Sequence, residues 1–281
     1  MIPTNAGHLY YVIGSGAQEN RDFGKGLDKA SIYDLIGSNS AESENTKYKN
    51  AITYIENYFA IKGACCIDFK TTYPGLLMGS GNLHPVSEQV SDDNKISDFQ
   101  NGFTFDWTTG LPVIHGSSVK GVIRNVFPKA NDLENVKKGK TAYLQEILKD
   151  SLIPSEFKVF SDELENSNTK EFIKKLEHTM FEENDIYHDA YICKFPKKSG
   201  EFFAEDYITP HEHPLKEPNP IRFLKIAPNI VFRFQFIPKE SAVMDITITP
   251  AHKLKLYAQI LEHFGIGAKR KYYGELKPVT Q

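Results

Sequence analysis

Alternation of large apolar and polar side chains over residues 230–237 is the feature that most limits how this chain can fold. Phe232, Phe234 and Phe236 share one face of the segment, and Arg233 and Gln235 share the other. A period of two residues is typical of a β-strand that packs one face on a core. The sequence therefore predicts a strand here, and the fold must contain a sheet.

The residues that follow predict a second strand and a helix. Residues 243–249 place Met244, Ile246 and Ile248 on one face, which predicts a strand. Thr249 and the following proline are typical of a helix start. The expected apolar face of that helix consists of Leu254, Tyr257, Ala258, Leu261 and Phe264. Gly265 then stands where a glycine commonly ends a helix.

The first two thirds of the chain give weaker but similar patterns. We expect an extended arm over 1–45, a helix over 47–59, a strand over 65–70, a short strand over 111–114, a helix over 119–127 with Ser118 as its N-cap, a strand over 187–195 and a proline-rich loop over 206–220. Residues 131–185 are charged and helix-prone, and we interpret them as a helical insertion.

This order of strands and helices predicts an α+β protein with a ferredoxin-like (RRM-like) sheet. At 281 residues the chain is long for one compact unit, but one unit with insertions accommodates it. We therefore expect a single domain over 1–281, in which residues 1–62 form an arm and a helix and residues 131–185 form the insertion.

Charge is distributed unevenly along the chain. The formal net charge is −3, which is not typical of a nucleic-acid-binding protein as a whole. Residues 161–190 are strongly acidic, whereas residues 115–140 and 251–281 are basic. This pattern suggests a polarised surface, although for the acidic stretch we prefer the interpretation as ordinary solvated helix faces.

The cysteines and apolar runs indicate an intracellular, non-membrane protein. Cys65, Cys66 and Cys193 form neither a disulfide framework nor a zinc-binding spacing. The first residues lack the pattern of a signal peptide, and no apolar run has the length of a membrane span. We expect a cytoplasmic protein that makes no contact with a membrane.

The segment Phe264–Leu276, FGIGAKRKYYGEL, is the strongest candidate for ligand binding. Its glycines allow close approach of the backbone, and Lys269, Arg270 and Lys271 supply charge that attracts phosphate. Tyr272 and Tyr273 add rings on which bases can stack. The segment matches neither a Walker A loop nor a dinucleotide fingerprint. The alternative is a capped helix that continues into a basic turn.

A second candidate is the segment 116–124, GSSVKGVIR. A turn of small residues at a helix start offers free N–H groups and a positive dipole end to a phosphate. Lys120 and Arg124 are four residues apart and share a face of that helix. The alternative is an ordinary capped helix with two surface cations.

Evidence for catalysis or metal binding is weaker. His211 and His213 form an H-x-H pair that would need His188 or Asp189 as a third ligand. The surrounding prolines favour a rigid structural loop instead. Asp106 and Asp189 lie beside aromatic residues, as general acids or metal ligands do, but such residues more often cap turns. We expect no catalytic residues, no metal and no cofactor.

Three segments together resemble the RAMP superfamily of CRISPR-associated proteins. Residues 108–124 resemble its P-x-S-S-x-K-G-x-x-R segment, which follows a glycine-rich loop similar to residues 75–85. Residues 264–274 resemble the C-terminal glycine-rich loop of the superfamily. Residues 206–228 are similar to a run found in one subtype, the sixth subunit of the type III-B Cmr effector complex. The sequence departs from the superfamily pattern at His115, where proline is usual.

The resemblance implies a non-catalytic subunit of an RNA-guided antiviral complex that binds the guide RNA toward its 3′ end. It implies other RAMP subunits as partners, and target RNA is a further candidate. The candidate RNA-binding residues are Gly116, Ser117, Ser118, Lys120, Arg124, Gly265, Gly267, Lys269, Arg270, Lys271 and Tyr272. The alternatives are a metal-independent endoribonuclease of the RAMP type that processes CRISPR RNA, and a metal- or nucleotide-binding enzyme that uses the H-x-H loop.

Overall fold

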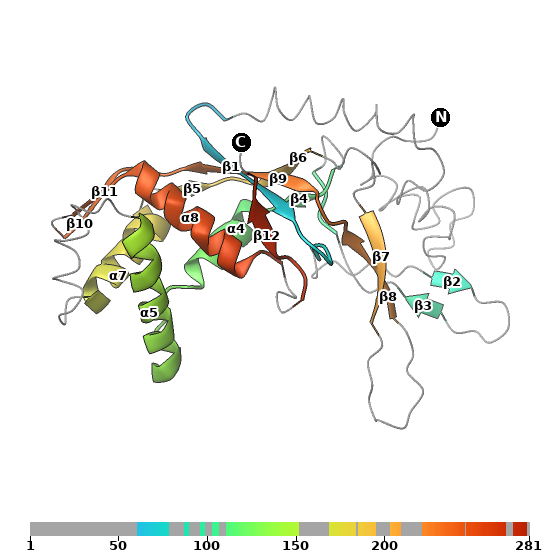
Figure 1. The fold of residues 1–281 in the computed structure, drawn as a ribbon, viewed down its shortest axis with the longest axis horizontal. Helices are drawn as coiled ribbons and strands as arrows, with labels where there is room; N and C mark the ends of the chain where they lie inside the picture. Colours follow the sequence, from blue (N-terminus) through green and yellow to red (C-terminus); the bar gives the residue numbers. More distant parts are fainter. Residues whose placement is uncertain are drawn as a thin grey trace.

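The computed structural model places one antiparallel sheet between a group of helices and an outlying hairpin (Figure 1). The residues that it describes are 61–78, 87–89, 96–98, 103–106, 111–151, 169–183, 185–194, 203–208, 221–244, 246–267 and 272–279. The arm and helix expected before residue 61 lie outside these residues, as do Lys269, Arg270, Lys271, His211 and His213.

The strands of the main sheet are not in chain order. The path across the sheet is β12 (Leu276–Pro278), β1 (Cys65–Thr71), β9 (Val231–Ile237), β6 (Ala190–Lys194) and β4 (Val113–Ile114), with β5 (Ile186–Tyr187) paired to β9. Two strands far apart in sequence, β1 and β9, therefore form the centre.

The alternation predicted for β9 is confirmed by its register. Phe69 of β1 lies opposite Phe232, and Phe234 lies opposite Ile67, so these side chains share one face. Phe69, Phe232 and Phe234 are completely buried. The Phe69 and Phe234 rings meet edge to face with centroids 5.7 Å apart. Burial of large rings like these is a main source of folding free energy.

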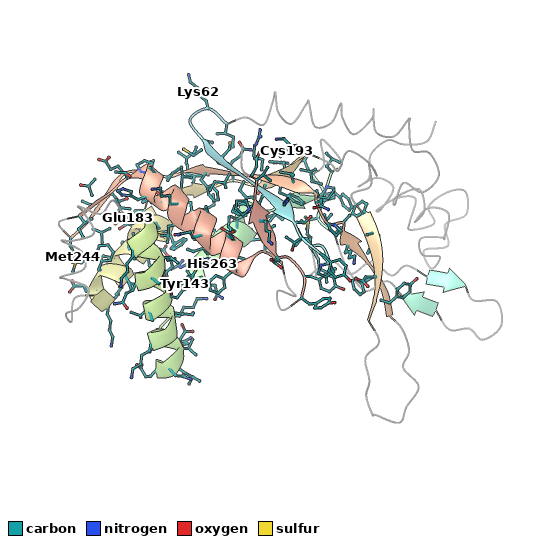
Figure 2. All side chains as sticks on the ribbon, viewed as in Figure 1. Lys62, Tyr143, Glu183, Cys193, Met244 and His263 are labelled. Carbon is teal, nitrogen blue, oxygen red and sulfur yellow. The ribbon has the colours of Figure 1, made fainter. Side chains whose placement is uncertain are left out.

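Helices cover the phenylalanine face of the sheet (Figure 1). They are α4 (Gly116–Arg124), α5 (Glu134–Ser151), α7 (Thr169–His178), the π-helical turn η2 (Thr179–Glu183) and α8 (Pro250–Phe264). Helix α8 packs on the sheet through Tyr257, whose ring lies 4.9 Å from that of Phe236. Helix α5 joins α8 through Tyr143 and His263, whose Oη and Nδ1 atoms are 2.9 Å apart (Figure 2). Within the described part of residues 131–185 the chain forms α5, α7 and η2, and their interpretation as an insertion stays a prediction.

Both predicted ends of α8 are confirmed. The Thr249 side chain accepts a hydrogen bond from the His252 backbone N–H at 3.3 Å, and the His252 ring lies 3.3 Å from the Thr249 N–H. This reciprocal arrangement is a capping box. Gly265 ends the helix with φ of 59°, a conformation that favours glycine.

The single strand predicted over residues 243–249 is wrong. The chain forms a hairpin of β10 (Ser241–Val243) and β11 (Ile246–Ile248), in which Val243 lies opposite Ile246. Met244 adopts φ of 55° at the reversal (Figure 2). A tight hairpin turn requires positive φ, and the turn leaves the apolar alternation intact on both sides. Periodicity alone therefore could not locate the turn.

Two other boundaries differ from expectation. The strand expected over residues 187–195 is divided into β5 and β6 by His188 and Asp189. The first residues of the loop expected over 206–220 belong instead to β7 (Phe203–Ile208), which pairs with β8 (Ile221–Ile226), and the rest of that range lies outside the described residues. A further hairpin joins β2 (Ser87–Gln89) to β3 (Ile96–Asp98).

Within the described residues, no helix has the length and apolar composition needed to cross a membrane.

The buried face of α8 is rotated from the predicted one because it contains a lysine. Leu256, Tyr257, Ile260 and Leu261 are buried as part of the apolar core, whereas Leu254, Ala258 and Phe264 are only partly buried. Lys253 is fully buried beside them. A charged group at such a position needs a partner, which the periodicity of apolar residues does not reveal.

The partner of Lys253 is Asp185, which directly precedes β5. The Lys253 ammonium lies 2.8 Å from the Asp185 carboxylate, and the two side chains are 0% and 1% exposed. Lys253 also donates to Ser241 Oγ at 2.8 Å, and the Tyr257 hydroxyl donates to Asp185 at 2.6 Å. The Tyr187 hydroxyl donates to that of Tyr257 at 3.1 Å. The network therefore joins α8, β5 and β10.

Removing one member of this pair is expected to be costly. We expect Lys253→Ala to lower the free energy of unfolding by about 3–5 kcal/mol, because the Asp185 carboxylate stays buried without its counter-charge. Urea denaturation followed by circular dichroism measures the change. Lys255→Ala, an exposed position on the same helix, is the control and should change stability by about 0.5 kcal/mol or less. A loss below about 1 kcal/mol for Lys253→Ala would contradict the assignment.

Candidate nucleic-acid interface

The described part of the Gly265–Gly274 loop is held by backbone hydrogen bonds. The Gly265 N–H donates to the Leu261 carbonyl at 2.8 Å, and the Ile266 N–H donates to the Gly274 carbonyl at 2.8 Å. The Gly274 N–H in turn donates to the Gly75 carbonyl at 2.8 Å. The loop is therefore closed at its base and joined to the chain that follows β1.

Glycine at these positions permits backbone to approach backbone. A Cβ atom at Gly267 would lie 2.6 Å from the Leu77 carbonyl oxygen, and one at Gly274 would collide with the Ile266 carbonyl oxygen. Gly267 and Gly274 also have φ of 101° and 85°. The sequence suggested that the glycines allow approach to a ligand. The structure gives Gly265, Gly267 and Gly274 a different immediate role, which is to hold the two ends of the loop together.

Two exposed tyrosines flank this base. Tyr272 is 64% exposed, and its ring centroid lies 5.3 Å from that of Tyr273. Tyr73, on the chain after β1, is 76% exposed. The Thr72 N–H donates to the Glu275 carbonyl at 3.2 Å, which brings the segment of Tyr73 to this base. Tyr273 is only 7% exposed, in contrast to the prediction that it offers a ring to a base, and burial chiefly raises the pKa of its phenol. Sequence reasoning included Tyr272 and missed Tyr73, whose only signal was its place at the start of a glycine-rich loop.

Tyr273 anchors the loop to the hairpin of β7 and β8. Its hydroxyl donates to the Asp206 carboxylate at 2.8 Å, and Lys225 pairs with the same carboxylate while lying 5.7 Å from the Tyr273 ring centroid. Desolvation raises the pKa of Asp206, but the hydrogen bonds from Lys225, the Tyr207 N–H and Tyr273 outweigh it and lower that pKa overall. The charge of Lys225 is therefore neutralised locally.

The second candidate segment begins differently from the prediction. Helix α4 starts at Gly116 with His115 as its N-cap, and the predicted N-cap, Ser118, lies inside the helix. The Gly116 N–H donates to the Asp189 carboxylate at 2.7 Å, and the N–H groups of Ser118 and Val119 donate to the His115 carbonyl. A carboxylate from another segment thus replaces a side-chain cap, which local sequence could not indicate. A phosphate at Gly116 would compete with this carboxylate.

The two cations of α4 share a face, as predicted, and that face contacts the C-terminal end of α7 and η2. Lys120 Nζ donates to the Phe181 carbonyl at 2.6 Å. Arg124 pairs with Glu177 at 2.9 Å and with Glu182 at 2.7 Å. The hydrogen bond to Glu177 chiefly raises the pKa of Arg124. Both side chains therefore have structural partners within the protein.

The two candidate segments contact different neighbours. Gly116 packs against the backbone of Tyr187 and His188, where a Cβ atom would collide with the Tyr187 carbonyl. The Gly265–Gly274 loop packs against Gly75 and Leu77. One groove lined by both segments stays a prediction.

A histidine and a carboxylate meet beside the start of α4. His115 Nδ1 lies 3.6 Å from Asp189 Oδ2, and the two side chains are 47% and 39% exposed. Burial, with smaller contributions from Asp189 and Asp106, raises the pKa of nearby Tyr191 to about 12. Within the described residues, no group of three or more His, Cys, Asp or Glu side chains is arranged to hold a metal ion. The H-x-H hypothesis concerns residues outside this part of the chain.

Glycine substitutions test how tightly the loop base is built. We expect Gly274→Ala to lower the free energy of unfolding by about 2 kcal/mol or more, because its positive φ is strained for alanine and its Cβ meets backbone. Gly121→Ala in α4 is the control, since nothing lies within 4 Å of its Cβ, and it should stabilise the protein by about 0.5–1 kcal/mol. Thermal denaturation measures both. Equal stability of the two variants would refute the close approach described here.

Two solved structures are distantly similar to this chain. No curated protein matches it. Among solved structures, the chain is similar to one in the cryo-EM structure of the type III-B Cmr-beta bound to cognate target RNA, with 18% identity and a TM-score of 0.47. That match covers 86% of this chain and 66% of the other, so the chain spans slightly less than two thirds of that relative. It is also similar to the crystal structure of Cmr6 from Pyrococcus furiosus, with 21% identity, a TM-score of 0.40 and coverage of 77% and 98%.

A family model, in contrast, matches most of the chain. The model of the RAMP superfamily matches residues 68–272, which is well over half of the sequence. This range includes α4 and most of the Gly265–Gly274 loop. The chain belongs to the RAMP superfamily.

Proposed function

We propose that this protein is a non-catalytic RNA-binding subunit of a type III-B Cmr effector complex, in which it binds the guide RNA toward its 3′ end. Membership of the RAMP superfamily supports this function, as do the motif resemblances at residues 108–124 and 206–228. Its partners would be the guide RNA and other RAMP subunits, with target RNA as a further candidate.

The core that carries this function is, in our proposal, ferredoxin-like. Along the chain the elements occur as β1, α4, β6, β9, α8 and β12, which is a β-α-β-β-α-β order. In space the four strands run β12, β1, β9, β6, all antiparallel. Helices α5 and α7 lie between α4 and β6 in the chain, where an insertion would enter. One RAMP domain over residues 1–281 accommodates this arrangement.

The observation that carries the RNA-binding proposal is the pair of exposed rings beside the basic loop. Tyr73 and Tyr272 come from segments about 200 residues apart. Backbone hydrogen bonds from Thr72 to Glu275 and from Gly274 to Gly75 nevertheless join the two segments, and the Tyr272 ring contacts Tyr273. Single-stranded RNA sites combine cations that contact phosphates with rings on which bases stack. Lys269, Arg270 and Lys271 directly precede Tyr272 and would supply the cations. In this proposal the glycine-closed base fixes the rings while the basic residues contact the backbone.

In this proposal Lys120 and Arg124 contribute less to RNA binding than the Gly265–Gly274 loop does. Their partners in α7 and η2 already satisfy them, so RNA contact there would require exchange of existing hydrogen bonds. Ser117 and Ser118 are exposed at the start of the helix and remain accessible to a phosphate. We therefore place the principal RNA contact at the Gly265–Gly274 loop, with Gly116–Arg124 as a secondary one.

A charge variant tests the loop. We expect a triple variant that combines Lys269→Ala, Arg270→Ala and Lys271→Ala to bind a short oligouridylate at least tenfold more weakly, because three phosphate contacts are lost. Fluorescence anisotropy over a range of salt concentrations measures the affinity, which should fall more steeply with salt for the parent protein. The control combines Lys62→Ala, Lys239→Ala and Lys255→Ala, three exposed lysines on other segments. Unchanged RNA affinity and salt slope in the loop variant would rule out the assignment.

The second candidate function is a metal-independent endoribonuclease, which the half-exposed His115–Asp189 pair favours. Such an enzyme uses histidine as a general base, and a carboxylate can orient the imidazole. Our proposal predicts no cleavage of single-stranded or repeat-containing RNA by the purified protein, with or without chelator. The measurement is gel electrophoresis of end-labelled RNA. Cleavage that persists in chelator and disappears in His115→Ala would establish the nuclease instead.

A further inference from the structure

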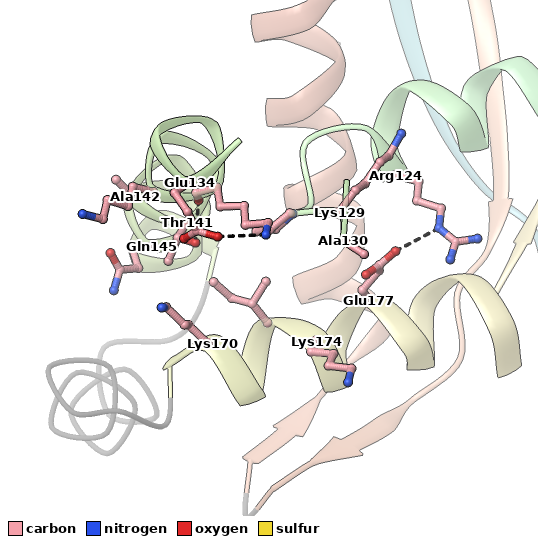
Figure 3. Close-up of a pocket in the computed structure, with 14 residues that line it drawn as sticks. Arg124, Lys129, Ala130, Glu134, Thr141, Ala142, Gln145, Lys170, Lys174 and Glu177 are labelled. Atoms are coloured by element: carbon pink, nitrogen blue, oxygen red, sulfur yellow. Dashed lines mark hydrogen bonds and ion pairs between the residues drawn. The ribbon is translucent and has the colours of Figure 1, made fainter. Parts of the chain in front are cut away.

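A basic groove lies between α5, α7 and the connection that follows α4, on the helical side of the molecule (Figure 3). Its volume is about 990 Å³. Its walls come from three parts of the chain, and Thr141 and Gln145 of α5 lie across it from Lys170 of α7 (Figure 3). Ala142 of α5 and Lys174 of α7 also line it. We refer to it as the α5–α7 groove. Of the candidate RNA-binding residues that the structure describes, only Arg124 lines it.

Cations outnumber anions in this lining. The basic residues are Arg124, Lys129, Lys137, Lys138, Lys170 and Lys174, and the acidic ones are Glu134 and Glu177. Both carboxylates already have partners, since Glu134 pairs with Lys137 at 2.9 Å and Glu177 pairs with Arg124 at 2.9 Å. Within the described part of the chain, Lys138, Lys170 and Lys174 have no ion pair. These three lysines therefore bring positive charge to the groove that no carboxylate of the described residues neutralises in an ion pair.

The pKa of one lining carboxylate supports this convergence. Lys137 chiefly lowers the pKa of Glu134, through a hydrogen bond and through its charge, and Lys170 and Lys138 add to the effect. Lys138 comes from α5 and Lys170 from the facing helix α7. The positive potential from both walls therefore reaches the same point.

Between these cations the lining is aliphatic. Pro128, Ala130, Ala142 and the edge of Ile173 contribute apolar surface, and the lysine stems add to it. None of the side chains that line the groove, all in the described part of the chain, is aromatic. Sites for single-stranded RNA combine cations with aromatic rings, so the chemistry here differs from that around Tyr73 and Tyr272. Aliphatic surface beside lysines is complementary to a polypeptide that carries both carboxylates and aliphatic side chains.

We propose that the α5–α7 groove binds an acidic, leucine- or isoleucine-containing segment of a neighbouring protein. The segment's carboxylates pair with Lys138, Lys170 and Lys174, and an aliphatic side chain lies on Ala142 and Ile173. The proposal rests on the proposed function only in identifying the neighbour as a subunit of the same complex. It gives the groove a protein partner and leaves RNA to the Gly265–Gly274 loop.

Peptides of defined composition test the chemistry directly. The probe is a fluorescent peptide of about 12 residues that alternates glutamate and leucine pairs, titrated with the full-length protein. We expect binding that weakens at least tenfold when every glutamate is replaced by glutamine, and again when every leucine is replaced by serine. An oligouridylate of similar length should not compete with the peptide. Competition by the oligouridylate, or equal binding of all three peptides, would overturn the proposal.

Substitutions locate the binding site. Lys138→Glu, Lys170→Glu and Lys174→Glu, combined, should weaken peptide binding at least tenfold and leave oligouridylate affinity within about twofold of the parent. The matched control makes the same charge change at Lys62, Lys239 and Lys255, exposed positions that do not line the groove. Circular dichroism verifies that both variants are folded. Equal loss of peptide binding in the two variants would show a non-specific charge effect and refute the site.

A second variant blocks the groove without changing its charge. Ala142→Phe, at an exposed helical position in the groove, should abolish peptide binding, whereas Ala251→Phe at an exposed position of α8 should not.

Failure of the proposed RNA-binding function can be distinguished from failure of the proposed peptide site. RNA binding that is insensitive to the Lys269–Lys271 substitutions would count against the proposed RNA-binding function. Peptide binding that is insensitive to Ala142→Phe would count against the α5–α7 groove as a peptide site.

Discussion

The ion pair between Lys253 and Asp185 sits at the junction on which the rest of the structure depends. Both side chains are removed from water, and desolvation of two charges costs several kcal/mol each unless geometry and further hydrogen bonds compensate. Here Ser241, Tyr257 and the Lys239 N–H complete the coordination. The arrangement forms only when α8, the start of β5 and β10 are all in place. It therefore fixes the rotation of α8 about its own axis.

That rotation determines where the candidate RNA interface lies. Helix α8 ends at Gly265, and the loop base is then joined to Gly75 by backbone hydrogen bonds and to Asp206 through Tyr273. These contacts come from three segments that are distant in sequence. The consequence is that the exposed rings of Tyr73 and Tyr272 are positioned by contacts at their base, and their own surfaces stay accessible. Preorganised rings lose little conformational entropy when a base stacks on them.

Some features that depend on neighbouring residues were predictable from the sequence, whereas features that depend on distant residues were not. The alternation of β9 and the Thr249 cap are local, and the structure contains both. The buried Lys253 requires Asp185, 68 residues away, and no periodicity reports such a partner. In the candidate site, contact of the loop glycines with a ligand stays a prediction, and the structure shows these glycines against protein backbone. Local sequence does not distinguish the two cases, because glycine in contact with protein backbone looks the same as glycine in contact with phosphate. Tyr73 was missed because its place near Tyr272 follows only from the pairing of β1 with β12.

The basic residues of the chain serve two different purposes in the structure. Several cations, such as Lys120 and Lys225, hold elements together through carbonyls or carboxylates within the protein. Lysines without an ion pair in the described residues converge instead on the α5–α7 groove, where the lining is aliphatic. Tyrosines, in contrast, surround the Gly265–Gly274 loop. Surfaces of the same sign but with different apolar neighbours select different ligands, because a ring stacks on a base whereas an aliphatic surface buries an aliphatic side chain. One chain of modest negative net charge can therefore carry an RNA contact and a protein contact without the two competing.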